Sequence, residues 1–215
     1  MSNTSTNRLV YTSWSLSTIV ALLAVIAWGN SLQWHASSIS AYSFFPLLGL
    51  VGFSVMWSHY VAGFLQETLG SDEQALKTYF RYTSYVVLLA ILLHPGILIY
   101  QRFRDGYGLP PGSYDNYFGP SLKWVVMLGS VSLLAFLAFE LHRFFGQKSW
   151  WKYVLSAGDL AMVAIFYHGL RLGDQLQSGW LRYVWIFYGL VLIAILLRKY
   201  ALLLPKTLKA RLHFG

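Results

Sequence analysis

The sequence predicts an all-α integral membrane protein, a bundle of six transmembrane helices with both termini in the cytoplasm. Of the 215 residues, 56% are hydrophobic and only 11% are charged, whereas water-soluble domains carry about 25% charged residues. The mean hydropathy is +0.50, and the apolar residues gather in runs that approach the roughly 20 residues needed to cross a bilayer. A third observation, the distribution of basic residues, indicates the orientation.

Six apolar runs are separated by polar, basic or Gly/Pro-containing stretches, and we expect each to be a membrane span. The first run is the shortest. A single basic residue precedes it and no small-residue cleavage site follows it closely, so we expect a true span rather than a signal peptide. The predicted spans cover residues 15–30, 44–65, 79–100, 122–141, 153–172 and 184–204, and they form one domain over residues 1–215.

The basic residues indicate how the spans are oriented. Cytoplasmic flanks of membrane proteins are enriched in Lys and Arg. Of the 16 basic residues, eleven fall on the side that holds both termini and five on the opposite side. Both termini are therefore expected in the cytoplasm. The net charge of +8 indicates contact with anionic membrane lipid rather than with nucleic acid.

Several kinds of chemistry find no support in the sequence. The chain has no cysteine, which excludes disulfides, thiolate metal sites and iron–sulfur clusters. It also lacks a Gly-rich phosphate loop, an HExxH zinc motif and the nucleophile elbow of hydrolases. The polar residues inside the spans are the remaining candidates for function.

Two histidines lie inside predicted spans, in the segments ILLHPGI (91–97) and AIFYHGL (164–170). The third and fifth spans both run outward from the cytoplasm, and His94 and His168 each lie well past the middle. We therefore expect both in the outer leaflet at one depth, facing the bundle interior. Two neutral imidazoles placed in this way supply both axial ligands of a b-type heme. The alternative is that each histidine only hydrogen-bonds a neighbouring helix.

Nearby residues suit a heme. Gly96 and Gly169 follow the histidines closely and would leave room for a flat macrocycle. Arg171 lies about one turn after His168, and Arg102 lies near the outer end of the third span. Arginines in these places would bind the heme propionates through charge-assisted hydrogen bonds.

Two stretches resemble the ferric reductase-like transmembrane domain family, which includes ferric reductases, NADPH oxidases and a bacterial heme-binding membrane subunit of a methionine sulfoxide reductase system. They are FRYTSYVVLLAILLHPGILIY at 80–100 and HRFFGQKSWWKYVLSAGDLAMVAIFYHGL at 142–170, about a quarter of the chain. Each combines a basic start with a histidine late in the span. The resemblance implies an electron-carrying heme protein of the bacterial subunit type, in the cytoplasmic membrane of a prokaryote.

The sequence departs from this family in the inner half of the ligand helices. Family members commonly bind two stacked hemes, with second histidines about thirteen or fourteen residues, nearly four turns, before the outer ones. Here those positions hold Phe80 and Arg81 in the third span, and Val154 and Leu155 in the fifth. We therefore expect a single heme b, in the outer leaflet.

A single outer heme leaves the electron donor open. A quinol could reduce it within the membrane, the protein could act entirely at the outer face, or His59 in the second span could ligate a displaced second heme. The expected exchange partners are a quinone, a metal ion or an extracytoplasmic redox protein. The residues after the sixth span leave no room for a nucleotide-binding domain, so an oxidoreductase of this kind would act as a subunit. The alternative is a heme-free six-helix membrane protein on the same scaffold: a transporter, a channel or an assembly subunit.

Other polar features have open roles. Asp159 lies nine residues before His168, about half a helical rotation away from that face. A structural hydrogen-bond network is the favoured interpretation for Asp159, and such a network or snorkelling of the side chain to the interface is favoured for Glu140. A proton relay to a quinone site is the alternative for both. The outer connection 101–121 is too rich in Gly and Pro to be helical, and it is either a plain surface loop or a lid. Polar or interfacial surroundings are expected for His35, His142 and His213.

Overall fold

The computed structural model describes residues 3–70, 74–140 and 147–203, and these residues form helices and connecting turns with no strand among them. The all-helical class predicted from the sequence is confirmed. The described part contains seven α-helices and two 3₁₀ helices: α1 (Asn3–Ser31), η1 (Ala36–Ser38), α2 (Ala41–Thr68), α3 (Lys77–Arg104), α4 (Gly112–Phe118), α5 (Lys123–Glu140), α7 (Trp151–Leu172), η2 (Asp174–Leu176) and α8 (Trp180–Leu203).

Five of these helices, α1, α2, α3, α7 and α8, are long and apolar enough to cross a membrane. The remaining predicted span, residues 122–141, corresponds to α5, whose apolar part Lys123–Ala138 is shorter and whose predicted last residue lies outside the described ones. The last residue of the predicted sixth span, at position 204, also lies outside them. Several helices run past the predicted spans. Helix α1 begins twelve residues earlier than expected, because no Gly or Pro precedes Gly29 to interrupt it.

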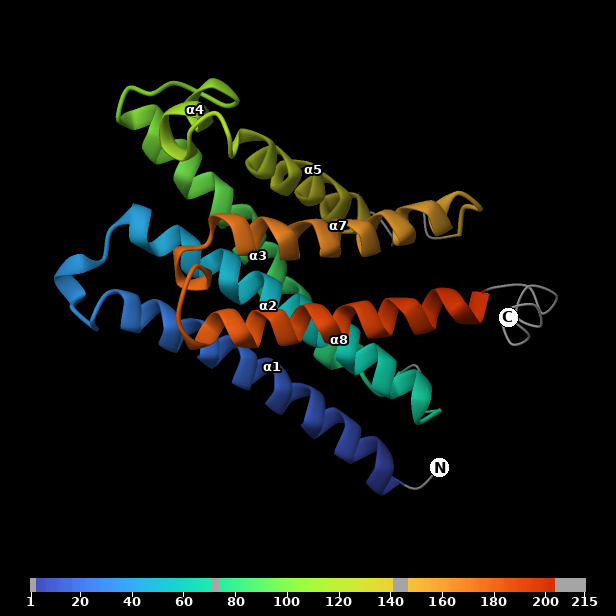
Figure 1. Ribbon diagram of the computed structural model, residues 1–215. Coiled ribbons are helices and arrows are strands. Elements are labelled where there is room, and N and C mark those ends of the chain that lie inside the picture. Colours follow the sequence, from blue (N-terminus) through green and yellow to red (C-terminus); the bar gives the residue numbers. More distant parts are fainter. Residues whose placement is uncertain (1–2, 71–73, 141–146, 204–215) are drawn as a thin grey trace, which may run out of the picture.

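The long helices alternate in direction, and α1 begins at the end of the bundle where α8 ends (Figure 1). Helix α2 packs against both α1 and α3, while α5 and α7 form a second pair. Helix α8 contacts both α2 and α7, and η2 joins it to the end of α7. The bundle is therefore built from two packed pairs, α2–α3 and α5–α7, which α8 connects.

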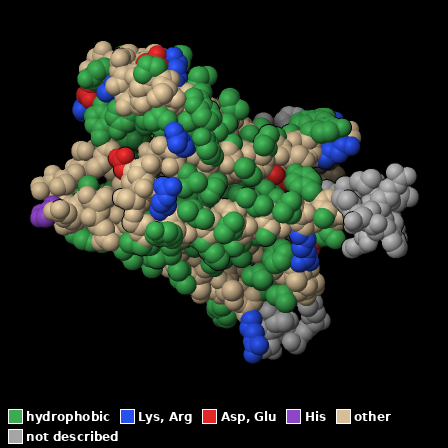
Figure 2. All heavy atoms as spheres, viewed as in Figure 1, with side chains coloured by type: hydrophobic (Ala, Val, Ile, Leu, Met, Phe, Trp, Pro, Cys, Tyr) green, Lys and Arg blue, Asp and Glu red, His purple; other side chains and the backbone are tan. Residues whose placement is uncertain are grey.

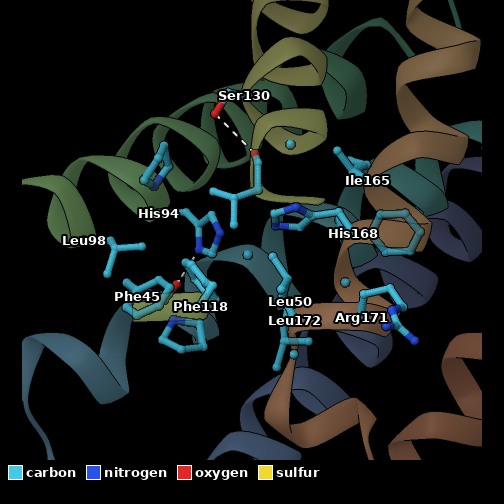
Figure 3. Close-up of a pocket in the computed structure, with 18 of the residues that line it drawn as sticks. Phe45, Leu50, His94, Leu98, Phe118, Ser130, Ile165, His168, Arg171 and Leu172 are labelled. Atoms are coloured by element: carbon cyan, nitrogen blue, oxygen red, sulfur yellow. Dashed lines mark hydrogen bonds between the residues drawn. The ribbon is translucent and has the colours of Figure 1, made fainter. Parts of the chain in front are cut away.

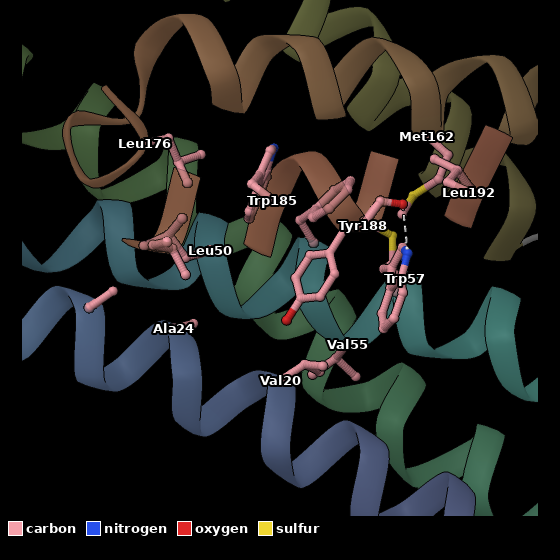
Figure 4. Packing of buried hydrophobic residues seen from close by; sticks show 14 of the residues in the cluster. Val20, Ala24, Leu50, Val55, Trp57, Met162, Leu176, Trp185, Tyr188 and Leu192 are labelled. Carbon is pink, nitrogen blue, oxygen red and sulfur yellow. Dashed lines mark hydrogen bonds between the residues drawn. The ribbon is translucent and has the colours of Figure 1, made fainter. Parts of the chain in front are cut away.

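Aromatic side chains of α2 and α8 form the centre of the core (Figure 4). The ring centroids of Phe53 and Trp185 are 4.3 Å apart, and those of Trp57 and Tyr188 are also 4.3 Å apart. The indole Nε1 of Trp57 donates to the backbone oxygen of Tyr188 at 2.9 Å, which satisfies the polar atom that a buried tryptophan brings with it. This cluster fixes α8 against α2.

Hydrophobic side chains cover much of the outer face of the helices (Figure 2). Leu160, Leu190 and Leu197 are each more than 60% exposed. Such large apolar surfaces on long helices are unfavourable in water and are expected against lipid tails. The surface therefore agrees with an integral membrane protein. On the connection between α1 and α2, His35 is exposed, as its sequence context predicts.

Candidate functional site: a cavity with two histidines

The structure brings the two predicted histidines together. His94 of α3 and His168 of α7 lie with their ring centroids 6.5 Å apart and their planes at 80° (Figure 3). Helix α3 packs on α2, and α7 packs on α5. Each imidazole therefore projects from its own helix pair into the space between the two pairs, and the two rings meet at one level of the bundle.

Each imidazole is held through one ring nitrogen. Nδ1 of His94 lies 2.8 Å from the backbone oxygen of Phe45 in α2, and Nδ1 of His168 lies 2.9 Å from that of Val125 in α5. A carbonyl oxygen only accepts, so both Nδ1 atoms carry the proton and donate. In the neutral imidazole Nε2 is then unprotonated and keeps a lone pair that can bind a metal. Each histidine thus does form the hydrogen bond to a neighbouring helix that the alternative interpretation expects. This bond uses only Nδ1, and Nε2 stays available for binding a ligand.

The glycines beside the rings are not the ones expected from the sequence. Gly96 does not line the cavity and has open space around it. Gly169 does line the cavity, but an added Cβ there would meet Trp185 at 2.7 Å rather than a histidine ring. These positions lie one or two residues after a histidine, and such neighbours do not share a helix face. The rings instead lie over Gly49 of α2 and Gly129 of α5, where an added Cβ would come within 2.8 Å and 2.6 Å of them.

A cavity of about 880 Å³ surrounds the histidine pair. Ligand and cofactor pockets commonly measure roughly 300–1,000 Å³. Apolar side chains make up one part of its wall: Leu50, Phe53, Ile91, Phe136, Ile165 and Trp185. Polar side chains at the start of α2, on α4 and after His168 make up another: Tyr42, Tyr117, Arg171, Asp174, Gln175 and Gln177. The cavity therefore suits a mostly apolar ligand with a polar or anionic edge.

The two predicted arginines occupy different environments. Arg171 is exposed and lines the cavity (Figure 3). Arg102 is only 6% exposed and is not among the lining residues. Its guanidinium carbon lies 3.4 Å from the ring centroid of Tyr107 and 5.2 Å from that of Tyr117. Since Tyr117 lines the cavity, the positive charge of Arg102 lies behind this ring rather than in the cavity itself.

The outer connection between α3 and α5 is partly helical and covers the cavity. The prediction that residues 101–121 are non-helical was wrong, because α3 continues to Arg104 and Gly112–Phe118 forms α4. Packing of the buried Tyr114 and the half-buried Phe118 against the cavity offsets the weak helix propensity of this segment. Tyr117 also lines the cavity but is 38% exposed. The Tyr42 hydroxyl donates to Asp105 and, as the main cause, holds the pKa of that carboxyl below its ordinary value. These contacts favour a cover over the cavity rather than a plain surface loop.

Asp159 belongs to a separate polar cluster and does not line the cavity. Its carboxylate is 5% exposed. It accepts hydrogen bonds from the Tyr60 hydroxyl at 3.0 Å, from Lys199 Nζ at 2.6 Å and from the Tyr200 hydroxyl at 2.8 Å. The structure therefore agrees with the favoured interpretation of Asp159 as part of a structural network, which ties α2 and α8 to α7.

Replacement of Asp159 by alanine should lower the free energy of unfolding by about 1–3 kcal/mol, because the hydroxyl of the half-buried Tyr60 loses its acceptor. The side chain of Lys199 is 46% exposed, so water solvates its ammonium when the carboxylate is removed. The broken ion pair therefore adds little to the loss of stability. Unfolding in detergent measures the difference. Glu67→Ala, at an exposed position of α2, is the matched control and should stay within about 0.5 kcal/mol. Equal stability of the two variants would contradict the structural role of Asp159.

His59 is engaged with a neighbouring helix. Its Nε2 lies 2.6 Å from the hydroxyl of Thr83, and its ring packs edge-on against Tyr79 and Phe80. The Thr83 hydroxyl donates to the backbone oxygen of Tyr79 at 2.7 Å, so it accepts from His59. In the part of the chain that the structure describes, no group of three or more His, Asp or Glu side chains is placed to hold a metal ion.

Other predicted polar groups lie outside the described residues: the side chain of Glu140, and His142 and His213.

Sequence reasoning missed the four residues that hold the histidines: Phe45, Gly49, Val125 and Gly129. Phe45 and Val125 act through backbone carbonyls, which leave no trace in a pattern of side chains. The glycines carry a weak signal, since each lies in the outer half of a predicted span adjacent in sequence to a span with a histidine. That signal does not separate Gly49 from Gly52, three residues later in the same helix.

Comparisons with protein-family models, with curated proteins and with solved structures found no match to this chain.

Proposed function

We propose that the protein is a b-type heme membrane protein of ferric reductase-like type, with one heme held between His94 and His168. The observation that carries the proposal is that His94 and His168, from two different helix pairs, line one cavity while each is held through Nδ1 by a backbone carbonyl, which leaves Nε2 of the neutral ring unprotonated. An imidazole nitrogen binds metal ions such as zinc at about 2 Å. The 6.5 Å between the two ring centroids therefore leaves room for one metal ion that both rings would hold.

The cavity walls suit a porphyrin in the same way. The apolar part, with Leu50, Phe53 and Ile165, would contact the macrocycle. The polar part carries Arg171, a suitable partner for the carboxylates of such a group. Gly49 and Gly129 provide the space in which the two imidazoles reach the cavity.

Bound heme would supply one-electron redox chemistry. His94 and His168 would hold its iron, and their Nδ1–H bonds to carbonyls orient the rings and raise the basicity of Nε2. Arg171 would neutralise propionate charge at the edge of the cavity, and Arg102 would add positive potential from behind Tyr117. The apolar lining excludes water from the histidine pair.

The proposal extends to the topology and the partners. Helix α5 would act as a sixth span, both termini would lie in the cytoplasm, and the host membrane would be the cytoplasmic membrane of a prokaryote. The excess of basic residues on the side of the termini supports this orientation. Electrons would be exchanged with a quinone, a metal ion or an extracytoplasmic redox protein. Inner histidines are not found at the expected positions of α3 and α7, so the proposal has one heme per chain.

A reduced-minus-oxidised visible spectrum of the protein purified from heme-replete cells tests the proposal. We expect sharp Soret and α bands and a ratio of heme to chain near one. A flat spectrum, even with heme added in excess, would overturn the proposal and favour the heme-free scaffold.

A further inference from the structure

We infer that Gly49 and Gly129 are positioning residues, whose missing side chains set the orientation of the two histidines toward the bound group. The inference rests on the proposed function. It deepens that function because it assigns the placement of each ligand to a residue on the neighbouring helix. The two glycines lie on different helices, α2 and α5, and they act on different histidines.

In the α2–α3 pair, His94 donates through Nδ1 to the carbonyl of Phe45, and its ring lies over Gly49, four residues later in α2. In an α-helix the carbonyl of residue i points toward the N–H of residue i+4, and these two residues lie one above the other. A ring that reaches this carbonyl from the neighbouring helix therefore lies directly against residue i+4, where a side chain would occupy the same space. A Cβ at Gly49 would lie 2.8 Å from Cε1 and 2.9 Å from Nδ1 of His94.

The α5–α7 pair repeats this arrangement. His168 donates through Nδ1 to the carbonyl of Val125, and its ring lies over Gly129, again four residues later. A Cβ at Gly129 would lie 2.6 Å from Cε1 and 2.7 Å from Nδ1 of His168. Both distances are shorter than non-bonded atoms tolerate. In each case the atoms that the Cβ would meet belong to a histidine ring that a hydrogen bond already fixes. An alanine at either position therefore turns or displaces the ring.

The duplication carries the argument beyond packing. Two helix pairs with no evident sequence repeat hold an imidazole over a glycine, with the same nitrogen bonded and the same nitrogen left for the cavity. Both rings then meet at 6.5 Å. Gly169 of α7 also lies under a ring, that of Trp185 at 2.7 Å from an added Cβ, but no other described glycine has a histidine ring at this distance; at Gly63 of α2 and Gly158 of α7 an added Cβ meets nothing within 4 Å.

A double-mutant cycle tests the contact without any cofactor. We expect Gly49→Ala to lower the thermal midpoint of the heme-free protein by several degrees, and the same change to be nearly neutral when His94 is already alanine. Gly129→Ala should behave in the same way with His168→Ala. A glycine variant that fails to fold and is rescued by the histidine change also supports the contact. The same loss of stability with and without the histidine would overturn it.

The second measurement addresses positioning in the protein loaded with heme. Gly49→Ala and Gly129→Ala should each weaken heme binding by about 10–100-fold, the usual effect of disturbing the residues that orient a metal ligand. Ring planes near 80° predict a highly anisotropic low-spin ferric EPR signal, and both variants should change that anisotropy. The controls Gly63→Ala and Gly158→Ala should match the wild type in both readouts.

The outcomes separate the two ideas. A wild-type protein that binds no heme refutes the proposed function, and the double-mutant cycle still decides whether the glycines fix the histidines. A wild-type protein that binds heme, with all four glycine variants alike in affinity and EPR signal, overturns the positioning role and leaves the proposed function standing.

Discussion

His94→Ala and His168→Ala should each abolish the low-spin heme spectrum and reduce retained heme by more than tenfold. Changes to residues that merely orient a metal ligand already cost about 10–100-fold in affinity, and these variants remove a ligand itself. The two effects should be similar in size, because both rings are held by a carbonyl at 2.8–2.9 Å and over a glycine. Heme content per chain and the visible spectrum measure both.

Two other histidines provide the controls for this prediction. His35→Ala changes an exposed residue, and His59→Gln changes a residue that is bonded to Thr83; both variants should keep the full spectrum. Free imidazole should restore the low-spin spectrum of His94→Ala, since it fills the space left by the ring. Full heme content in both alanine variants, or equal loss in the two controls, would refute the assignment of the ligands.

The helices and the histidine pair can be predicted from the sequence because both follow from the order of residue types along the chain. Apolar runs of bilayer length mark the spans, and the positions of His94 and His168 within two parallel spans predict a common depth. The alternating helix directions account for the shared level of the two histidines, whereas the 6.5 Å between their ring centroids depends on how the two helix pairs pack. Helix ends were less well predicted, because polarity changes before the helix stops: α1 continues back to Asn3.

The supports of the site escape prediction because they are properties of three-dimensional packing. No pattern of side chains shows that the carbonyls of Phe45 and Val125 face histidines on other helices. The buried position of Arg102 depends on how α4 folds over the end of α3, and the sequence alone placed its charge at the heme edge. Likewise, the partners of Asp159 come from α2 and α8, far from it in the chain.

Trp185→Ala should be among the most destabilising single changes in this chain, at about 3–5 kcal/mol. Its side chain is 2% exposed and packs against Phe53 at 4.3 Å between ring centroids. Its Nε1 donates to the backbone oxygen of Phe166 at 3.2 Å, and its ring fills the space beside Gly169, next to His168. The variant therefore leaves a void between α2, α7 and α8 that also borders the cavity, so heme retention should fall together with stability.

Two matched variants separate the causes. Trp185→Phe keeps an aromatic ring in the cluster and loses the indole hydrogen bond, which should cost about 1 kcal/mol plus a smaller packing loss. Trp180→Ala removes a tryptophan of the same helix that is 40% exposed, and it should cost less than about 0.5 kcal/mol. The order of stability in detergent should therefore run from Trp180→Ala through Trp185→Phe to Trp185→Ala. If Trp185→Ala unfolds no more easily than Trp180→Ala, the aromatic cluster is not what fixes α8 against α2. Other contacts must then hold the part of the cavity wall that Trp185 forms.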